Sequence, residues 1–346
     1  MRALVFGVGV AVLSAAPALA CGVMVSEEGT AELAGFEALL SWSDGGETLL
    51  VAVRYASPED EFAWMMPFPE PPQVEEGTLE PILAAREIST PPPPEPEGDG
   101  EGAGAPPPVG VDVIDREVVG DLELVTLGSE RAAELQRWMR SHGFAFHDTQ
   151  EEAVQAYLDE GWVIVAARVL PGAPPEGEMV PVRFRFDAEE PVYPLRVAGS
   201  SHADELPMEL YVVTPFRPES ETFAETVVRP REGSFPDARD RLEVRYSAPL
   251  TQDERARLRS PGVRPKRGAW LTRYEAAWRP ETLDADLVLR SSPVQEAVDF
   301  TVAEEADDRG SLATTIAIAA AAAVILVAVA VVSRLRAGRR PQGGPV

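Results

Sequence analysis

The chain is poor in residue types that commonly form covalent cross-links or reactive centres. Among its 346 residues there are one cysteine, Cys21, three histidines and one lysine, Lys266. A single cysteine cannot form an intramolecular disulfide, so packing alone must hold the fold together, and a chain of this length can bury enough surface for that. The shortage of lysine accompanies abundant Ala, Gly, Pro and Arg, and we attribute it to codon usage rather than to function.

Positive charge is also scarce. The sequence holds 31 basic side chains against 57 acidic ones, a formal net charge of −26 at pH 7. Nucleic-acid binding needs clustered Lys and Arg to neutralise phosphates, so this balance argues against nucleic acid as a partner. An acidic surface repels anionic lipid and favours metal cations, basic partners or plain solubility, and solubility is the commonest reason for one.

Motifs of the common catalytic classes are missing. The sequence has no Gly-x-Ser-x-Gly nucleophile elbow and no His-Glu-x-x-His zinc motif, and Ser201 and His202 are adjacent, unlike the members of a triad. Gly7 and Gly9 lie in the N-terminal apolar segment and form no phosphate-binding loop. Cys21 is a thiol without an identifiable base. We therefore predict no catalytic residue and no cofactor.

Two weak metal patterns are present. His142 and His147 flank a predicted turn beside Asp148, which could form a zinc site, but a pair of loop histidines before a helix is the simpler interpretation. Asp99–Gly102 is too flexible and wrongly spaced for a calcium loop. We therefore predict no metal ligand.

The N-terminal segment has the layout of a secretory signal peptide. Arg2 precedes an apolar stretch from Ala3 to Val12, and Ala18-Leu19-Ala20 supplies small residues at the positions that signal peptidase reads. The predicted cut lies between Ala20 and Cys21. Cys21 would then begin the mature chain and is the candidate for lipidation, but the residues before it favour a simple cut.

A second targeting signal lies near the C-terminus. Residues 312–332 carry no charge and would form a helix about 31 Å long, which matches a hydrocarbon core of roughly 30 Å. Four arginines follow within the tail 333–346, whereas acidic residues precede the stretch. The positive-inside rule then places the tail in the cytoplasm and the N-terminal domain outside a cell membrane crossed once.

The segments between these signals predict a modular chain. After the signal peptide (1–20) we expect a main extracytoplasmic domain (21–230), a smaller β-rich unit or extension (231–292), an acidic stalk (293–311), the span and the basic tail. Within residues 89–110, more than half of the positions are Pro or Gly, which indicates a solvated loop without packing.

Two strands stand out before that loop. Glu47–Tyr55 is rich in β-formers, and Phe62–Phe68 places large side chains at every second position. Ser57–Asp60 between them fits a type I turn, so we expect an antiparallel hairpin. Pro67 cannot donate to a ladder, so the second strand is expected either to lie at a sheet edge or to pass into polyproline conformation as it leaves the sheet. Its alternating row, Phe62 to Phe68, is expected to form core.

The remaining pattern predicts an α+β fold, mostly an antiparallel β-sheet, with two adjacent helices at about 129–160. The first helix runs from Ser129 to Arg140, and the second begins at a capping box of Thr149 and Glu152 and ends at Gly161. Further expected elements are strands at 111–114, 122–127, 162–169, 180–186, 194–197, 210–213, 242–246, 270–278 and 287–289, and a short helix at 252–258. Arg183 and Arg185 alternate with apolar residues and predict a solvated strand face.

Four segments occur in an order that is similar to a known family. They are Cys21-Gly22, Val53–Tyr55 followed by Asp60–Pro69, Leu135–Met139 leading to Gly143-Phe144, and Val192–Val197. Together they resemble an exported bacterial family called domain of unknown function 2330. The resemblance implies an exported, often membrane-anchored protein and brings no assigned activity. Members typically have a second cysteine soon after the first, and its absence here removes any implied thiol pair.

Two functions remain open at this stage. The favoured one is a membrane-anchored surface interaction or structural domain with an unidentified protein or envelope partner. The alternative is an extracytoplasmic enzyme whose site is assembled from scattered Asp, Glu and Arg. A deep pocket with convergent carboxylates in contrasting environments would favour the enzyme.

Overall fold

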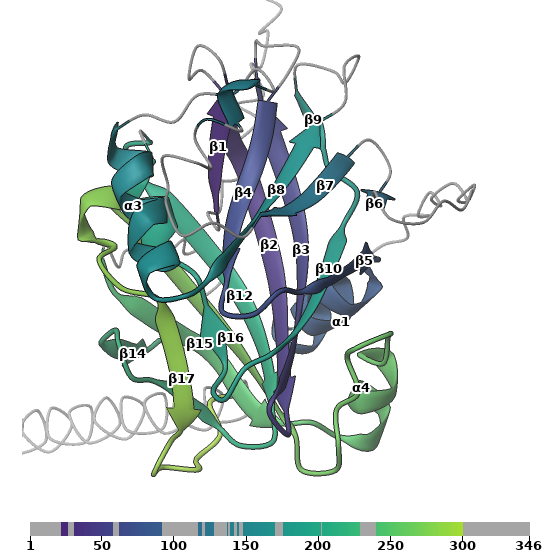
Figure 1. The fold of residues 1–346 in the computed structure, drawn as a ribbon. Coiled ribbons are helices and arrows are strands. Elements are labelled where there is room, and N and C mark those ends of the chain that lie inside the picture. The colour runs from purple at the N-terminus through teal and green to yellow at the C-terminus, as the bar shows by residue number, and fades with distance from the viewer. Residues whose placement is uncertain are drawn as a thin grey trace, which may run out of the picture. The chain divides into compact units, whose positions relative to one another are not determined.

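The computed structural model describes a body of strands and short helices (Figure 1). The chain divides into two compact units, residues 1–298 and 299–346, and all described elements belong to the first. The described residues are 22–26, 31–57, 62–91, 117–119, 122–127, 137, 139–141, 144, 148–169, 176–201, 203–228 and 240–299.

Several predicted features lie outside these residues. They are the signal peptide with Ala20 and Cys21, most of the Pro/Gly loop and the strand after it, most of the helix 129–140, the three histidines, the span 312–332 and the tail. No helix within the described ranges is long and apolar enough to cross a membrane.

Two large sheets form the body. The first has the order β1(Val23–Ser26), β4(Phe62–Phe68), β8(Val163–Val169), β7(Leu122–Leu127), β6(Glu117–Val119), and all its pairs are antiparallel. The second has the order β14(Glu225–Val227), β15(Leu242–Pro249), β16(Trp270–Trp278), β12(Leu206–Thr214), β2(Glu32–Ser43), β3(Gly46–Ala56), β10(Val182–Asp187), β5(Gln73–Glu76), with β9(Glu176–Glu178) also paired to β3. Its β12–β2 and β14–β15 pairs are parallel. The fold is thus β-rich and mostly antiparallel with few helices, as predicted.

The main core lies between the inner faces of the two sheets. Alternate residues of β4, namely Phe62, Trp64, Met66 and Phe68, point into it and are at most 1% exposed, which confirms the prediction for this row. Phe184 of β10 meets the row from the other sheet, with ring centroids 6.1 Å from Trp64 and 4.7 Å from Phe68.

One helix covers the outer face of the five-stranded sheet. α3(Asp148–Asp159) buries Val154, Tyr157 and Leu158 against this face in a second apolar cluster. The helix begins at Asp148, so Thr149 lies in its first turn rather than at the cap. It ends in a Schellman motif, in which the Gly161 amide donates to Leu158 and the Trp162 amide to Tyr157, both at 3.0 Å. Gly161 has φ +86°, the left-handed conformation that favours glycine.

One helix packs on the outer face of the nine-stranded sheet, and a second lies beside it. α1(Glu80–Ile88) packs against β2 and β12 through buried Ile82, Ala85 and Ile88. α4(Gln252–Arg257) was expected from the sequence and begins with a capping box in which Thr251 and Glu254 bind each other's backbone amides. α1 was not expected. A third sheet of β11(Val192–Tyr193), β17(Leu287–Ser291) and β13(Pro218–Ser220) completes the body with the 3₁₀ turns η1(Arg196–Ser200) and η2(Pro280–Thr282).

The expected hairpin of β3 and β4 is wrong. β3 pairs with β2 and β10, and β4 pairs with β1 and β8, so the two consecutive strands lie in different sheets. The strand β4 is not an edge strand either, because it pairs with β1 on one side and with β8 on the other. Pro67 lies beyond Met65, the last residue of β4 that pairs with β1, so at Pro67 only β8 is a neighbour. The strand accommodates Pro67 because the proline stands where β4 has one neighbour only.

The hairpin that does form joins β2 to β3. Asp44 and Gly45 both have positive φ, 56° and 81°, as a two-residue type I′ turn requires.

The strand expected at 194–197 is also wrong, because the chain turns there into η1. Gly199 in this turn approaches the segment around η2 so closely that a Cβ would lie 2.6 Å from the carbonyl oxygen of Leu283. Later residues, which the sequence allowed as a separate unit or an extension, supply β15 and β16 to the nine-stranded sheet.

Candidate functional site

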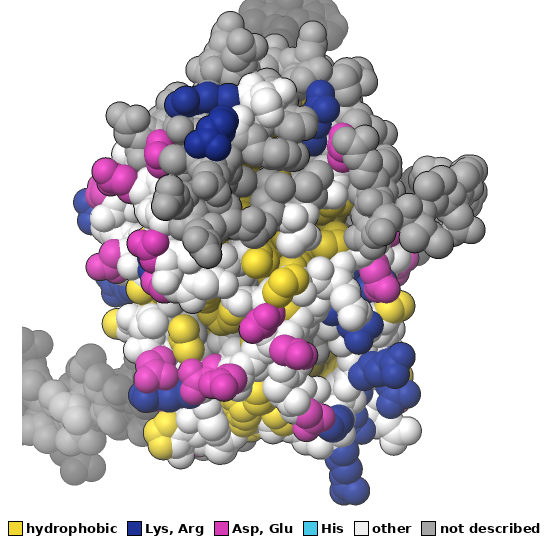
Figure 2. Space-filling view, viewed as in Figure 1, with side chains coloured by type: hydrophobic (Ala, Val, Ile, Leu, Met, Phe, Trp, Pro, Cys, Tyr) yellow, Lys and Arg dark blue, Asp and Glu magenta, His cyan; other side chains and the backbone are white. Residues whose placement is uncertain are grey.

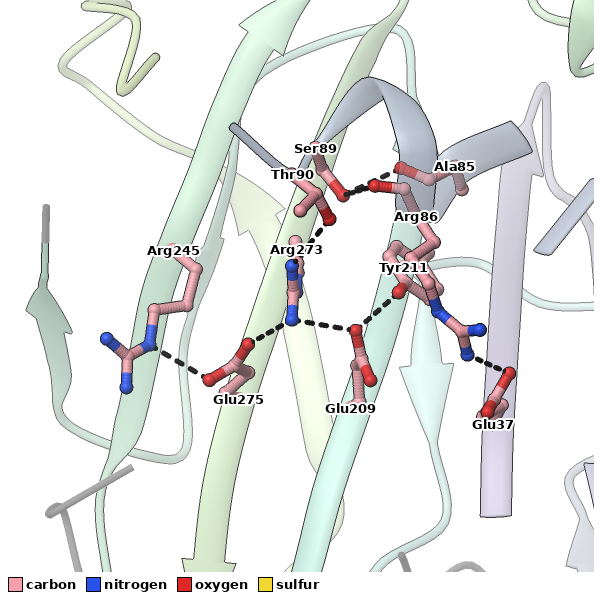
Figure 3. A network of polar contacts seen from close by, with 10 residues as sticks. All are labelled: Glu37, Ala85, Arg86, Ser89, Thr90, Glu209, Tyr211, Arg245, Arg273 and Glu275. Carbon is pink, nitrogen blue, oxygen red and sulfur yellow. Dashed lines mark hydrogen bonds and ion pairs between the residues drawn. The ribbon is translucent and has the colours of Figure 1, made fainter. Parts of the chain in front are cut away.

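The outer face of the nine-stranded sheet carries an unusual number of charged side chains. In β12 and β16 the residues that alternate with core positions include Glu209, Arg273 and Glu275, and in β15 Glu243 lies beside them. These residues, with Arg245, form a network next to α1, and Figure 3 draws all of them except Glu243. We call it the charged ladder.

Three glutamates form one row of the ladder. Glu275 is paired directly opposite Glu209 of β12 and Glu243 of β15, an arrangement that would be repulsive without cations. Arg245 lies 2.5 Å from Glu243 and 3.0 Å from Glu275, and Arg273 lies 2.5 Å from Glu275 and 2.9 Å from Glu209. A register shift between Val244 and Tyr246 makes Arg245 the extra residue of a β-bulge. Each arginine therefore bridges two neighbouring glutamates.

The ladder continues to α1. The Tyr211 hydroxyl donates to Glu209, and Arg273 donates to Thr90 just after the helix at 3.1 Å. On the far side, Arg86 of α1 forms an ion pair with Glu37 of β2. α1 is thus attached to the sheet by polar contacts as well as by its apolar face (Figure 3).

Burial controls the electrostatics of the ladder. Desolvation raises the pKa of Glu275 although Arg273 and Arg245 oppose it, and desolvation with the Glu209 charge raises the pKa of Tyr211 well above its usual value. Every glutamate of the row faces an arginine, so none is free to act as a base. The ladder is best described as a network that holds the strands and α1 in register.

A polar groove of about 570 Å³ lies further along the same face. Its floor is built from β3, β10 and β5, where Thr48, Arg185, Asp187 and Gln73 alternate with core residues. Glu70 and Glu75 form one side. Glu75 is held at 2.7 Å by Arg183, the neighbouring cation on β10.

The opposite wall is the turn Ser260–Val263. Ser260 and Val263 exchange two backbone hydrogen bonds of 3.1 Å around Pro261 and Gly262, whose φ is +80°. Thr48 donates to the Gly262 carbonyl at 3.1 Å, and a Cβ on Gly262 would lie 2.7 Å from the Thr48 hydroxyl. The wall therefore touches the floor closely enough to require glycine, which makes the groove preformed.

Two arginines at the groove lack partners. Arg185 on the floor and Arg264 beside the wall are exposed, and neither forms an ion pair or hydrogen bond with the described part of the chain. Other described arginines, Arg259 and Arg267 among them, are likewise without a partner among the described residues, so what distinguishes Arg185 and Arg264 is their place at the groove. Asp187 and Glu70 line the same groove, so it offers charges of both signs. Free guanidinium groups bind carboxylates and phosphates through two parallel hydrogen bonds.

The residues singled out from the sequence contribute little to this face. Ala20, Cys21 and the histidines lie outside the described residues, and Ser201 accepts a hydrogen bond from the Ala203 amide in a loop. Within the described ranges no three His, Cys, Asp or Glu side chains are placed to hold a metal ion. The exception is Arg185, whose predicted position on a solvated strand face is confirmed.

The ladder was missed by sequence reasoning. A signal was present, because charged and apolar residues alternate in Glu209–Tyr211, Glu243–Arg245 and Arg273–Glu275. That alternation marks a polar strand face, but it does not say which strands are neighbours.

One comparison with known proteins identifies the family. A family model described as "Uncharacterized protein conserved in bacteria (DUF2330)" matches residues 15–290, well beyond the segments that suggested it. No curated protein matches the sequence.

Solved structures give weak likenesses. The crystal structure of baculovirus P35 matches with 10% identity and a TM-score of 0.38, over 74% of this chain and 95% of that one. A mutated baculovirus P35 after caspase cleavage matches with 11% identity and a TM-score of 0.35, over 74% and 99%. These TM-scores support no transfer of fold or activity to this chain.

Proposed function

Because the chain belongs to the DUF2330 family of uncharacterized bacterial proteins, from which no activity can be carried over, we propose a function from its own geometry: a membrane-anchored extracytoplasmic domain that binds a partner. The binding site is the polar groove. Its ligand is a polar molecule or peptide segment that presents a carboxylate or another anion to Arg185 and Arg264.

The preformed groove carries this proposal. The Thr48–Gly262 hydrogen bond fixes the wall of the groove to its floor, so a ligand binds with little entropic cost of ordering the site. The guanidinium groups of Arg185 and Arg264 are exposed and can pair with that ligand. The groove also lies on a sheet face, a rigid support for recognition.

The cellular location rests on the sequence. The signal-peptide pattern of residues 1–20 supports export, and the apolar stretch 312–332 followed by arginines supports a single span with the domain outside.

The enzyme alternative has less support. Carboxyl groups with a raised pKa include Glu47, Glu225, Glu275 and Asp286, and desolvation is the main cause for each. Of these, only Glu47 is among the residues that line the groove, and its carboxylate is buried toward the core side, where it accepts the Val192 amide. The four groups do not converge on the groove, as an acid–base pair there would require.

Site-directed photocrosslinking tests the binding site. A photoreactive residue replaces Gln73 on the groove floor, and a matched control replaces exposed Thr149 on α3, across the body from the groove. In the producing cells we expect a discrete adduct from position 73 and none from position 149. The charge reversal Arg185→Glu should reduce the adduct at least severalfold. Equal labelling from both positions would contradict the proposal, as would an adduct whose yield is unchanged by Arg185→Glu.

A further inference from the structure

A basic surface stands out on this acidic molecule. Residues 252–267, which form α4 and the loop after it, contain six basic and two acidic side chains, whereas the whole chain has 31 basic and 57 acidic ones. The six are Arg255, Arg257, Arg259, Arg264, Lys266 and Arg267. We call them the basic patch. Figure 2 shows dark blue side chains gathered where Figure 1 draws α4 and the loop near it.

The patch is exposed and only partly neutralised. Arg257 pairs with Glu87 of α1 at 2.5 Å, Lys266 pairs with Asp44, and Arg255 donates to the Leu250 carbonyl at 2.8 Å. Three others, Arg259, Arg264 and Arg267, are exposed and form no ion pair or hydrogen bond with the described residues. Their charge is therefore available to a partner.

The patch is also rigidly presented. Its loop is fixed to the sheet by the Thr48–Gly262 contact and by burial of Val263 and Leu258, both 0% exposed. The three unpaired cations, Arg259, Arg264 and Arg267, are therefore presented by an ordered segment.

Charge is segregated over the body. The exposed side chains of α3 and the turn after it include three acidic ones, Glu152, Asp159 and Glu160, and Figure 2 shows acidic groups gathered over this helix. An anionic surface repels such a face and attracts the basic patch, so it selects one orientation of the domain.

We propose that the basic patch docks on the anionic headgroups of the membrane in which the chain is anchored. The inference rests on the membrane anchor of the proposed function. Between Asp299, the last described residue, and the predicted span at 312 the chain can extend at most about 45 Å, so the tether keeps the domain near the bilayer at high effective concentration. Each Lys or Arg near an anionic leaflet strengthens binding about fivefold.

Because the unpaired cations of the patch are exposed, a broad anionic surface is a better partner for them than a single acidic peptide. Docking would orient the domain and leave the groove, whose rim shares only Arg264 with the patch, facing the space beside the membrane.

Hydrogen exchange of the full chain in nanodiscs tests the docking. One set of discs contains phosphatidylcholine alone, and the other contains about one third phosphatidylglycerol. At about 50 mM salt we expect amides of residues 255–268 to exchange at least severalfold more slowly in the anionic discs. The difference should vanish near 1 M salt, where the Debye length falls to about 3 Å. Amides of α3 serve as an internal control and should not change.

Charge reversal gives the matched comparison. Arg259→Glu with Arg267→Glu should abolish the protection, whereas Arg241→Glu with Arg290→Glu, an equal change of charge elsewhere on the surface, should leave it intact. Equal exchange in both kinds of disc overturns docking. Docking is also overturned if added polyglutamate protects the amides of residues 255–268 in phosphatidylcholine discs whereas phosphatidylglycerol does not protect them. If the chain does not insert into discs, the anchor of the proposed function fails. Co-sedimentation with phosphatidylglycerol vesicles then tests the patch alone. If Arg259→Glu with Arg267→Glu lowers the affinity for the vesicles by less than tenfold, the inference is overturned.

Discussion

Single residues show how closely neighbouring segments of one sheet approach each other. Gly22 has φ +85°, and a Cβ at this position would lie 2.3 Å from the Trp64 ring nitrogen and 2.4 Å from the Met65 carbonyl oxygen. The glycine of the Cys21-Gly22 segment is therefore required by the close packing of β1 on β4, whatever the fate of the cysteine.

Gly22→Ala should lower the free energy of unfolding by about 1–3 kcal/mol, because it combines a strained φ with overpacking. Chemical denaturation measures the change. Gly161→Ala is the matched control, since its φ of +86° is equally strained but its Cβ would have no neighbour within 4 Å. If both variants lose the same free energy of unfolding, the contact with Trp64 makes no contribution to stability.

Trp64 is the largest fully buried side chain of the core row, at 1% exposed. Trp64→Ala should cost about 3–5 kcal/mol, a large share of a typical domain's 5–15 kcal/mol. The variant should melt well below the parent, while Leu83→Ala, at an exposed position of α1, should change little. A Trp64→Ala protein that melts like the parent would contradict the core assignment.

Glu47 is a buried carboxyl group without an opposing charge. It is 2% exposed, its Oε2 accepts the Val192 amide at 2.9 Å, and its Oε1 has no hydrogen-bond partner. Desolvation raises the pKa of Glu47 well above its usual value, with the Val192 amide opposing. The folded state therefore favours the protonated form.

A raised pKa makes stability fall as pH rises. Above about pH 4.3 the unfolded chain releases the Glu47 proton while the folded chain retains it, so the free energy of unfolding drops by up to about 1.4 kcal/mol per pH unit until the folded pKa is passed. Glu47→Gln should remove this contribution in denaturation curves taken from pH 4 upward. Glu76→Gln, at an exposed position of β5, should keep it. A parallel pH dependence in wild type and Glu47→Gln would count against the argument.

At the scale of elements, a polar cluster attaches α3 to the segments around η1 and β17. Asp286 accepts the Tyr157 hydroxyl and, at 3.0 Å, the Arg196 amide, and Arg196 forms two hydrogen bonds of 2.6 and 2.7 Å with Glu160. The Arg196 guanidinium also stacks 4.2 Å from the Tyr157 ring centroid. Four side chains, two of them from α3 and the turn after it, thus join three segments that are distant in sequence.

Tyr157→Phe should loosen this junction by about 1–3 kcal/mol, because it leaves Asp286 without the hydroxyl donor and the Val197 amide without its acceptor while keeping the ring. Amide exchange of α3 should accelerate accordingly. Gln155→Ala on the same helix, where the side chain bonds to Asp159 at the surface, should have little effect. Unchanged exchange in Tyr157→Phe would mean that apolar packing alone holds α3.

At the scale of the whole molecule, topology is the property with most consequence for function. In the proposed topology the domain lies outside and the tail inside, so protease added to intact cells, or to spheroplasts where an outer membrane is present, should degrade the domain. Lysed cells provide the control for protease sensitivity. Full protection in intact cells would refute the outward orientation and, with it, the proposed partner.

The sequence by itself determined the β-rich class, the family, the position of nine of the seventeen described strands, the long strand β2 not among them, and that of α3 and α4. These are local properties: alternation identifies a strand and its buried face, and capping residues mark helix ends. The same logic placed Phe62, Trp64, Met66 and Phe68 in the core. The Asp44-Gly45 turn was readable in the same way and was overlooked.

Only the tertiary structure decided which strands are neighbours. Alternation in β3 and β4 is satisfied equally by a hairpin or by two facing sheets, and burial of Trp64 against Phe184 of the opposite sheet chose the second. The groove and the ladder depend on that choice, because Arg185, Arg264 and the glutamate row come from segments far apart in sequence. Charges so separated acquire a common function only through strand register, which no local pattern encodes.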